Sequence, residues 1–231
     1  MLMKMYSNIS STASLIGDST RISILTALTD GRALTAGELA SIAGVTPQAA
    51  SSHLTKLLEG SLISVETQGR HRYYKLASPE VIQAIEAIAI ISPPIKVRSL
   101  RQSSHKKALE YARTCYNHLA GRFGVALTQA LIELDYLHDL GEVYEITNKG
   151  KEWMTTFGID FEKINLNAIP HHIDWTERKH HLAGPLAANM MDRLFELNWI
   201  SKSSIRRSIQ ITQTGRENIL QMFGFDPECL Q

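Results

Sequence analysis

Residues 44–62, GVTPQAASSHLTKLLEGSL, predict a helix with an unusual exposed face. Four apolar residues recur at helical spacing and indicate one buried stripe: Ala50, Leu54, Leu57 and Leu58. The opposite face carries short amide and hydroxyl side chains, where an ordinary surface helix favours Glu and Lys. No acidic residue occurs between positions 46 and 58. Such a face suits a partner that exchanges hydrogen bonds and repels carboxylates.

The residues before this stretch predict a second helix that a tight turn joins to it. Thr35 and Glu38 have the spacing of a capping box, and Gly44 stands where a helix ends in the left-handed conformation. Thr46 followed by proline is a typical start for the next helix. With an earlier helix that Asp18 can cap, these signals predict a helix-turn-helix.

After the quoted helix the apolar pattern changes, which predicts a β-hairpin. Residues 62–65 and 72–76 read as strands on either side of a turn at 68–71. The tip of this hairpin is basic and aromatic, as expected of a wing. Ser78 then begins one more helix, which runs to about Ile91 and ends at prolines.

The composition is that of an ordinary globular protein. The chain has 231 residues, 44% of them hydrophobic and 20% charged, and a formal net charge of +1. Charge alone identifies no partner. Two cysteines imply no disulfide framework. We expect a soluble, cytoplasmic protein without membrane contact, since the start lacks a signal-peptide core and the apolar run 84–92 is far shorter than the roughly 20 residues of a membrane span.

The C-terminal half contains an internal repeat at a spacing of roughly 63–66 residues. The sequence His-Leu-Ala-Gly starts at His118 and at His181 and is predicted to open a helix each time. A hairpin and a second helix should follow in both copies, as in a small winged-helix unit. The predicted fold is mainly α with small β-hairpins (α+β). Its domains are a winged helix-turn-helix at 1–95, a basic linker or helix at 96–112, and repeats at 113–165 and 166–231.

The segment 96–113 holds six Lys and Arg residues against one acid, Glu110. A solvated linker or helix face explains such a strip, and contact with DNA phosphates or with a second copy is the alternative. Residues 201–216 carry four basic residues and no acid, so a second DNA contact stays open there beside a solvated hairpin.

The polar face of the quoted helix fits the major groove of DNA. Gln can read adenine with two hydrogen bonds, Ser and Thr serve several bases, and Lys contacts phosphate. A merely polar, Ser-rich helix is the alternative. Base contacts are predicted from Gln48, Ser51, Ser52 and Thr55. Contacts with phosphates or the flanking groove are predicted from Thr46, His53, Lys56, Arg70, His71 and Arg72.

The first 95 residues resemble the winged-helix repressors of the ArsR/SmtB family. The resemblance rests on segments 16–25, 38–57 and 69–74, with the specific pattern Ser-x-His-Leu-x-x-Leu in the second helix. It implies a homodimeric repressor that reads a palindromic operator and leaves DNA when an inducer binds. The helix around Glu38 lacks the Cys-x-Cys motif of many metal and arsenic sensors in the family, so that site is absent.

The C-terminal half resembles a longer branch of the same family. The resemblance rests on CYNHLAG at 115–121 and DWTERKHHLAG at 174–184. In that branch a cysteine often stands two residues before the Asp-Trp pair, where this chain has His172. The resemblance supports a regulator and implies no particular inducer.

Four residues are candidates for sensing a signal: Cys115, His118, His172 and His181. If Cys115 and His118 lay on one helix face, they could share a metal ion with the later histidines. Packing is the simpler alternative, with each His satisfying a buried carbonyl or a helix end, and a redox role for Cys115 is a third. The sequence therefore predicts no cofactor outright, and a metal ion at this cluster stays open.

Three classes of function are compatible with these features. The first is a DNA-binding repressor whose partners are double-stranded DNA, a second copy of the chain and an unidentified inducer. The second is a protein-interaction module of stacked winged helices. The third is an enzyme that uses the Cys/His cluster with Asp174 or Glu177. No nucleophile elbow, phosphate loop or HExxH motif occurs, so we expect no enzyme.

Overall fold

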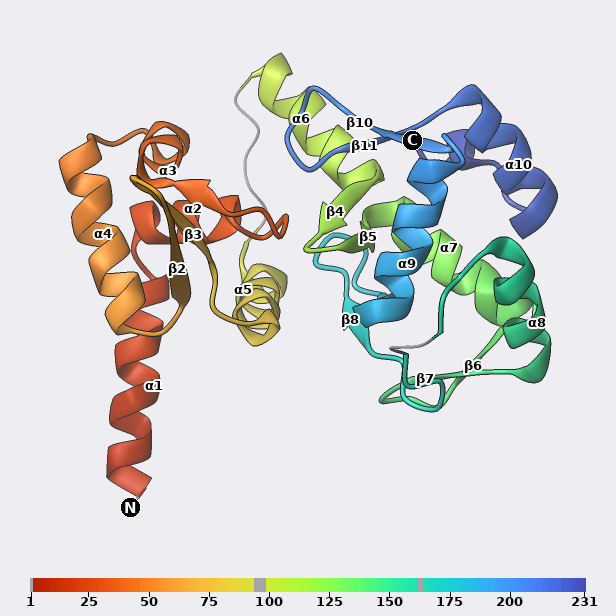
Figure 1. The fold of residues 1–231 in the computed structure, drawn as a ribbon, viewed down its shortest axis with the longest axis horizontal. Coiled ribbons are helices and arrows are strands. Elements are labelled where there is room, and N and C mark those ends of the chain that lie inside the picture. The colour runs from red at the N-terminus through yellow and green to blue at the C-terminus, as the bar shows by residue number, and fades with distance from the viewer. Residues whose placement is uncertain (1, 94–98, 162–163) are drawn as a thin grey trace. The chain divides into compact units, whose positions relative to one another are not determined.

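The computed structural model describes residues 2–93, 99–161 and 164–231 (Figure 1). The chain divides into two compact units, residues 1–88 and 89–231. The domain boundary predicted at residues 95 and 96 lies outside the described residues, as does the start of the predicted basic segment. Within the described ranges, no helix has both the length and the apolar character needed to cross a bilayer.

The N-terminal unit is a winged helix-turn-helix. Its helices are α1 (Leu2–Ile16), α2 (Ser19–Ala27), α3 (Ala36–Ala43) and α4 (Pro47–Glu59), followed by α5 (Pro79–Ile91), whose last three residues lie beyond the boundary at residue 88. Its strands are β1 (Leu34–Thr35), β2 (Ile63–Gln68) and β3 (His71–Leu76), paired antiparallel in the order β1-β3-β2. The predicted helix-turn-helix and wing are confirmed, whereas α1 and β1 were not predicted.

Local capping contacts explain where these helices begin and end. The Asp18 carboxylate accepts hydrogen bonds from the N–H groups of Thr20 and Arg21 at 3.0 and 2.9 Å. Thr35 and Glu38 form the predicted capping box, and Gly44 ends α3 with φ of 67°. These contacts satisfy backbone groups that a helix end leaves without partners.

A buried stripe on α4 fixes the orientation of this helix. Ala50, Leu54 and Leu57 are at most 1% exposed and belong to the core of the unit. Leu58, predicted to share the stripe, is half-buried at its edge. The opposite face of α4 therefore points to solvent.

The C-terminal unit shows the same order of elements twice, after α6 (Leu100–Tyr111). The first set is β4 (Arg113–Cys115), β5 (His118–Ala120), α7 (Gly121–Glu133), β6 (Leu137–Asp139), β7 (Tyr144–Ile146) and α8 (Asn148–Phe157). The second set is β8 (His171–Ile173), β9 (His180–Leu182), α9 (Gly184–Glu196), β10 (Ile200–Lys202), β11 (Ile209–Ile211) and α10 (Gln213–Phe223). A short 3-10 helix, Pro227–Leu230, follows.

The prediction that His118 and His181 open helices was wrong. Both residues lie in strands, and the long helices begin three residues later at Gly121 and Gly184. These glycines have φ of 78° and 72°, a conformation that turns the chain from strand to helix and that other residues rarely adopt. Each half is therefore hairpin–helix–hairpin–helix, with one hairpin more than predicted.

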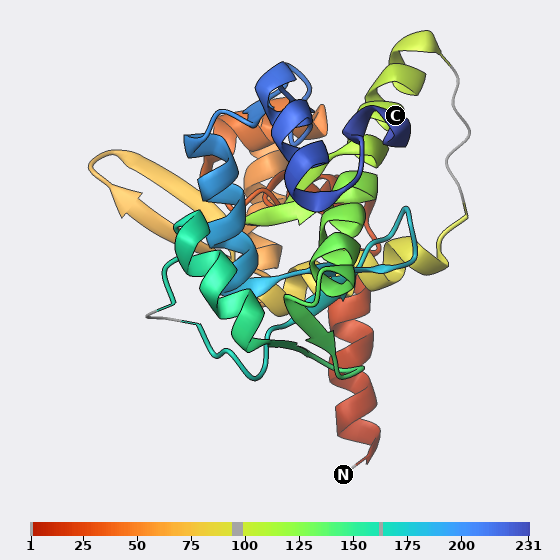
Figure 2. The same cartoon turned by 90° about the vertical axis from the view of Figure 1, so that its right-hand side faces the viewer.

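Each half of this unit packs its first hairpin against the other half. Strand β9 lies against α7, β5 lies against α9, and β5 and β9 contact each other (Figures 1 and 2). The Leu182 N–H donates to the Thr128 hydroxyl at 2.8 Å, and that hydroxyl donates to the Gly124 carbonyl at 2.9 Å. The hairpins β4–β5 and β8–β9 consequently meet inside the unit.

Candidate functional site

The exposed face of α4 carries all four side chains predicted to contact bases. Gln48, Ser51, Ser52 and Thr55 are exposed, and the Thr55 hydroxyl donates to the Ser51 carbonyl at 3.1 Å. Lys56 is exposed next to them. From Gln48 to Lys56, a row of hydrogen-bonding groups without a carboxylate thus faces solvent, and the exposed Glu59 ends the helix.

Two other predicted contact residues have structural roles of their own. The Thr46 hydroxyl caps α4 by accepting from the Ala49 N–H at 3.3 Å. His53 is half-buried, and its Nδ1 lies 3.6 Å from the Asp18 carboxylate that caps α2. His53 therefore links α4 to α2, which limits how far its ring can reach outward.

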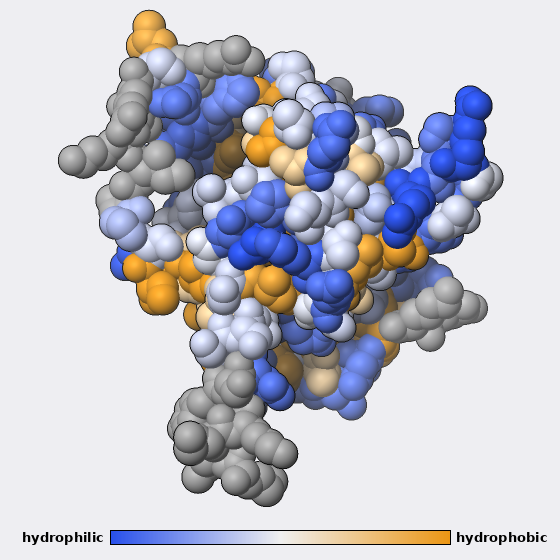
Figure 3. Space-filling model, turned by 90° about the vertical axis from the view of Figure 1, so that its left-hand side faces the viewer, coloured by the Kyte–Doolittle hydropathy of each residue, from blue (hydrophilic) through white to orange (hydrophobic). Residues whose placement is uncertain are grey.

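The wing presents its basic residues at the tip of the β2–β3 hairpin. Arg70, His71 and Arg72 are exposed, and Gly69 at φ of 58° forms the turn. Figure 3 shows this side of the N-terminal unit, where the wing projects as a hydrophilic knob beside the polar surface of α4. The unit thus offers a polar helix face together with a cationic extension.

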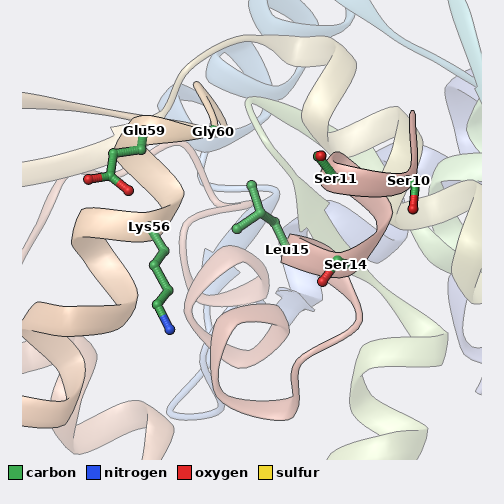
Figure 4. Close-up of a pocket in the computed structure, with 7 residues that line it drawn as sticks. All are labelled: Ser10, Ser11, Ser14, Leu15, Lys56, Glu59 and Gly60. Atoms are coloured by element: carbon green, nitrogen blue, oxygen red, sulfur yellow. The ribbon is translucent and has the colours of Figure 1, made fainter. Parts of the chain in front are cut away.

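An open pocket lies between α1 and the end of α4 (Figure 4). Leu15 projects between the two helices, and a Cβ at Gly60 would come within 2.1 Å of its Cδ1. The pocket is lined by Ser10, Ser11, Ser14, Leu15, Lys56, Glu59 and Gly60. Lys56 belongs to both this lining and the exposed polar row of α4.

The four predicted sensing residues converge in the C-terminal unit. One potential ligand atom from each of them lies within 4.8 Å of the other three: Cys115, His118, His172 and His181. Cys115 faces His118 across the β4–β5 hairpin, and His172 faces His181 across β8–β9. The predicted shared helix face was wrong, because strand register and not helical spacing brings each pair together.

Burial keeps the imidazoles of this cluster neutral. Cys115, His118 and His181 are at most 1% exposed, and His172 is half-buried. Burial, with some repulsion from His181 and His172, holds the pKa of His118 well below its usual value. Burial lowers the pKa of His181 to about 3, although the Asp174 carboxylate acts in the opposite direction. Neutral imidazoles have a free lone pair and can bind metal ions.

A buried ion pair lies beside the cluster. Arg113 donates to Asp174 at 2.7 Å, and both side chains are at most 1% exposed. Asp174 also accepts from the Gly121 N–H at 2.6 Å and from the Thr176 hydroxyl at 2.6 Å. Burial opposes its charge, but Arg113 and these hydrogen bonds hold the pKa of Asp174 far below its usual value. Asp174 Oδ2 lies 3.9 Å from His181 Nδ1.

Sequence reasoning missed the burial of Arg113, since an arginine in a basic segment gives no sign of burial.

Basic residues of the segment 201–216 pair with other residues of the same unit. Arg216 pairs with Asp226 at 2.8 Å and with Glu228, and the Arg207 Nε–H donates to the Thr114 carbonyl at 3.1 Å. These contacts weigh against a second DNA surface there.

Comparison with known proteins locates the first unit among DNA-binding domains. A family model described as a helix-turn-helix domain matches residues 16–66. The uncharacterized HTH-type transcriptional regulator YdfF of Bacillus subtilis (strain 168) is 44% identical over 212 residues, which span 90% of this chain and 94% of that protein. This similarity extends through both units.

Solved structures match the N-terminal part. NolR from Sinorhizobium fredii is 26% identical, with a TM-score of 0.37, covering 38% of this chain and 88% of its own. The transcriptional repressor BigR from Xylella fastidiosa is 18% identical, with a TM-score of 0.37, covering 41% of this chain and 95% of its own. On the identity and coverage of the Bacillus relative, the chain belongs to the helix-turn-helix transcriptional regulators, a class of DNA-binding proteins.

Proposed function

We propose that the protein is a homodimeric transcriptional repressor of the ArsR/SmtB type. The α4 helices of two copies read the half-sites of a palindromic operator, and a signal received in the C-terminal unit releases the DNA. One observation carries this proposal: the polar face of α4 is exposed, carries no acid between Thr46 and Leu58, and is fixed outward by a buried apolar stripe.

The chemistry of this face matches duplex DNA. Gln48, Ser51, Ser52 and Thr55 supply donors and acceptors for base edges, and Lys56 and the wing arginines supply charge for phosphates. Phosphate contacts position a protein on the duplex, whereas base contacts give sequence preference. The surface offers both kinds of group next to each other.

A dimer explains the apolar residues left at the surface of two helices. Ile9 on α1 is 57% exposed, and Ile88 and Ile91 on α5 are 40% and 83% exposed. A second copy would cover such side chains and set the spacing of the two α4 helices. Half-sites of a dimeric helix-turn-helix protein lie about one helical turn apart, ~34–36 Å. A small rotation within the dimer would then suffice to weaken binding.

We propose no catalytic role for the Cys/His cluster. Of the two acids that an enzyme could use there, Asp174 and Glu177, Asp174 is fixed in an ion pair with Arg113 and buried from solvent. A DNA-binding regulator must have access to chromosomal DNA, which agrees with the expected cytoplasmic location. The remaining alternative, a protein-interaction module, differs in that it would need no DNA.

DNase I footprinting on the DNA upstream of the protein's own gene tests the proposal. We expect protection of two half-sites about one helical turn apart at near-physiological salt. Binding should exceed that of an unrelated duplex by about 1,000-fold or more. Equal affinity for both duplexes, or none for either, would overturn the repressor proposal and favour the protein-interaction module.

A further inference from the structure

We infer that Cys115, His118, His172 and His181 form a four-coordinate site for a zinc ion. This inference goes beyond the regulator assignment and does not depend on DNA binding. It rests on the positions of four side chains from two hairpins, on their chemistry and on the groups behind them.

The geometry of the four side chains is close to that of a tetrahedral site. Ligand atoms around zinc lie roughly 3.3–3.6 Å from one another. His118 Nε2 and His181 Nε2 are 3.2 Å apart, which is already near one edge of such a tetrahedron. All four ligand atoms lie within 4.8 Å, so the others need to approach by roughly 1 Å.

The β register supplies the ligands as two pairs. Cys115 and His118 are direct cross-strand partners, as are His172 and His181. Side chains of directly opposed residues stand about 4.5–5.5 Å apart at Cβ, a separation that suits two ligands of one ion. Since β5 and β9 contact each other, the two pairs point into one space. A bound ion would tie the two halves of the unit together.

The donor set favours zinc over the oxygen-seeking cations. Imidazole and thiolate are ligands for zinc and its neighbours among the transition metals, whereas Ca²⁺ and Mg²⁺ take oxygen ligands. The histidines are neutral, as metal ligands must be, and the Cys115 thiol would lose its proton to become a thiolate when the ion binds. The resulting charge of the ion and thiolate is +1, and the Asp174 carboxylate lies next to it.

The groups behind the cluster resemble the outer shell of a metal site. A histidine that binds metal through one ring nitrogen usually donates the other N–H to a carboxylate or a carbonyl. His181 Nδ1 is buried without a hydrogen bond, and Asp174 Oδ2 is 3.9 Å away. Arg113, Gly121 and Thr176 hold that carboxylate in place. A small shift of the ring completes a carboxylate–histidine–metal arrangement.

A packed cluster without metal explains these contacts less well. The Nε2 atoms of His118 and His181 can share only one hydrogen bond, whereas an ion between them would take up the lone pairs of both. A redox role is also disfavoured, because the Cys115 side chain has 0% exposure and soluble oxidants do not reach it.

Cobalt titration of the full-length, chelator-treated protein tests the site. One Co²⁺ per chain should bind with the strong visible absorption of a four-coordinate cobalt ion and a thiolate-to-cobalt charge-transfer band. Zn²⁺ should displace it. Absence of these bands, together with no zinc retained after dialysis, would overturn the inference.

Matched variants locate the ion. Cys115→Ser should remove the charge-transfer band, and His172→Ala, at a half-buried position, should weaken Zn²⁺ binding about 100-fold or more. The controls Cys229→Ser and His180→Gln replace the second cysteine and a neighbouring strand histidine, and should bind as the parent does. Circular dichroism of each metal-free variant verifies folding. Loss of the ion in the controls, with no change in Cys115→Ser and His172→Ala, would contradict the assignment.

Discussion

The two units of the chain place the polar side chains of their candidate sites in opposite ways. In the N-terminal unit, the hydrogen-bonding residues of α4 and the basic wing residues lie at the surface. In the C-terminal unit, Arg113, His118, Asp174 and His181 are at most 1% exposed. An exposed row can meet a large, charged partner, whereas enclosed groups in fixed geometry can hold only something small.

Because of this difference, substitutions in the two units should change different properties, stability in one and DNA affinity in the other. A buried charge depends on its partner, so changes in the C-terminal unit should act on stability. Exposed polar groups contribute little to folding, so changes on α4 should act on DNA affinity. The tryptophans at 153, 175 and 199 all lie in the C-terminal unit, so tryptophan fluorescence reports the unfolding of that unit.

The largest expected effect comes from Asp174→Asn, which leaves the Arg113 charge buried without its counter-ion. We expect the free energy of unfolding of the C-terminal unit to fall by about 3–5 kcal/mol. Urea unfolding followed by tryptophan fluorescence measures it. The control is Glu196→Gln, which breaks a surface pair with Arg193 at 2.9 Å and should cost about 0.5 kcal/mol or less. Equal effects of the two variants would contradict the contrast between buried and exposed charges.

Two glycine-to-alanine substitutions extend the comparison of the two units to the packing around the backbone. A Cβ at Gly215 would lie 1.9 Å from the Trp199 carbonyl oxygen, so Gly215→Ala should destabilise the C-terminal unit by about 3 kcal/mol. A Cβ at Gly37 in α3 would meet no other atom within 4 Å outside its own helix backbone, so Gly37→Ala should be neutral or stabilise by about 0.5 kcal/mol. Thermal unfolding by circular dichroism measures both, and a stable Gly215→Ala protein would show that the close approach is not rigid.

Acid should weaken the metal-free C-terminal unit. The pKa of His181 is about 3 in the folded protein and 6.5 as its ordinary value. Below pH 6.5, His181 becomes protonated in the unfolded chain but stays neutral in the folded chain. The free energy of unfolding therefore falls as the pH drops. At pH 5, His181 should lower the free energy of unfolding by about 2 kcal/mol, and His118 acts in the same direction. Urea midpoints by tryptophan fluorescence at pH 7 and 5, with chelator present, check it, and identical midpoints would contradict the buried neutral imidazoles.

The smallest effects concern single contacts of α4 with DNA. Gln48→Ala should reduce discrimination at one base pair by about 1–3 kcal/mol. Lys56→Ala should weaken binding to all sequences alike and lower the slope of log affinity against log salt by about 1. Fluorescence anisotropy with operator and mutated duplexes separates the two. An unchanged salt slope for Lys56→Ala would show that Lys56 does not contact a phosphate.

The N-terminal fold could be predicted because its signals are local. The capping residues Asp18 and Thr35, the left-handed Gly44 and the Thr46–Pro47 start each act within a few residues. In the C-terminal unit the repeat was visible, but strands of three residues are too short to show an alternating pattern. From the sequence alone, the segment His-Leu-Ala therefore resembles a helix start.

Much of the C-terminal site could be predicted by residue type but not by geometry. Cys115, His118, His172 and His181 stood out as chemistry-bearing residues near repeated motifs. Their convergence depends on strand pairing and on the exchanged packing of the two hairpins, which join residues about 60 positions apart. The burial of Arg113 follows from its ion pair with Asp174, a contact that no local pattern reveals.

The most direct test of the account is the affinity for operator DNA of two matched variants, Thr55→Asp and Thr155→Asp. Both threonines are exposed on helices, and each hydroxyl donates to the carbonyl four residues earlier, Thr55 in α4 and Thr155 in α8. We predict that Thr55→Asp loses at least about 100-fold in affinity, because its carboxylate would lie in the DNA groove, where the negative charge of the duplex repels it, while Thr155→Asp binds as the parent does. Equal affinities for the two variants would contradict the claim that α4 is the DNA-reading surface.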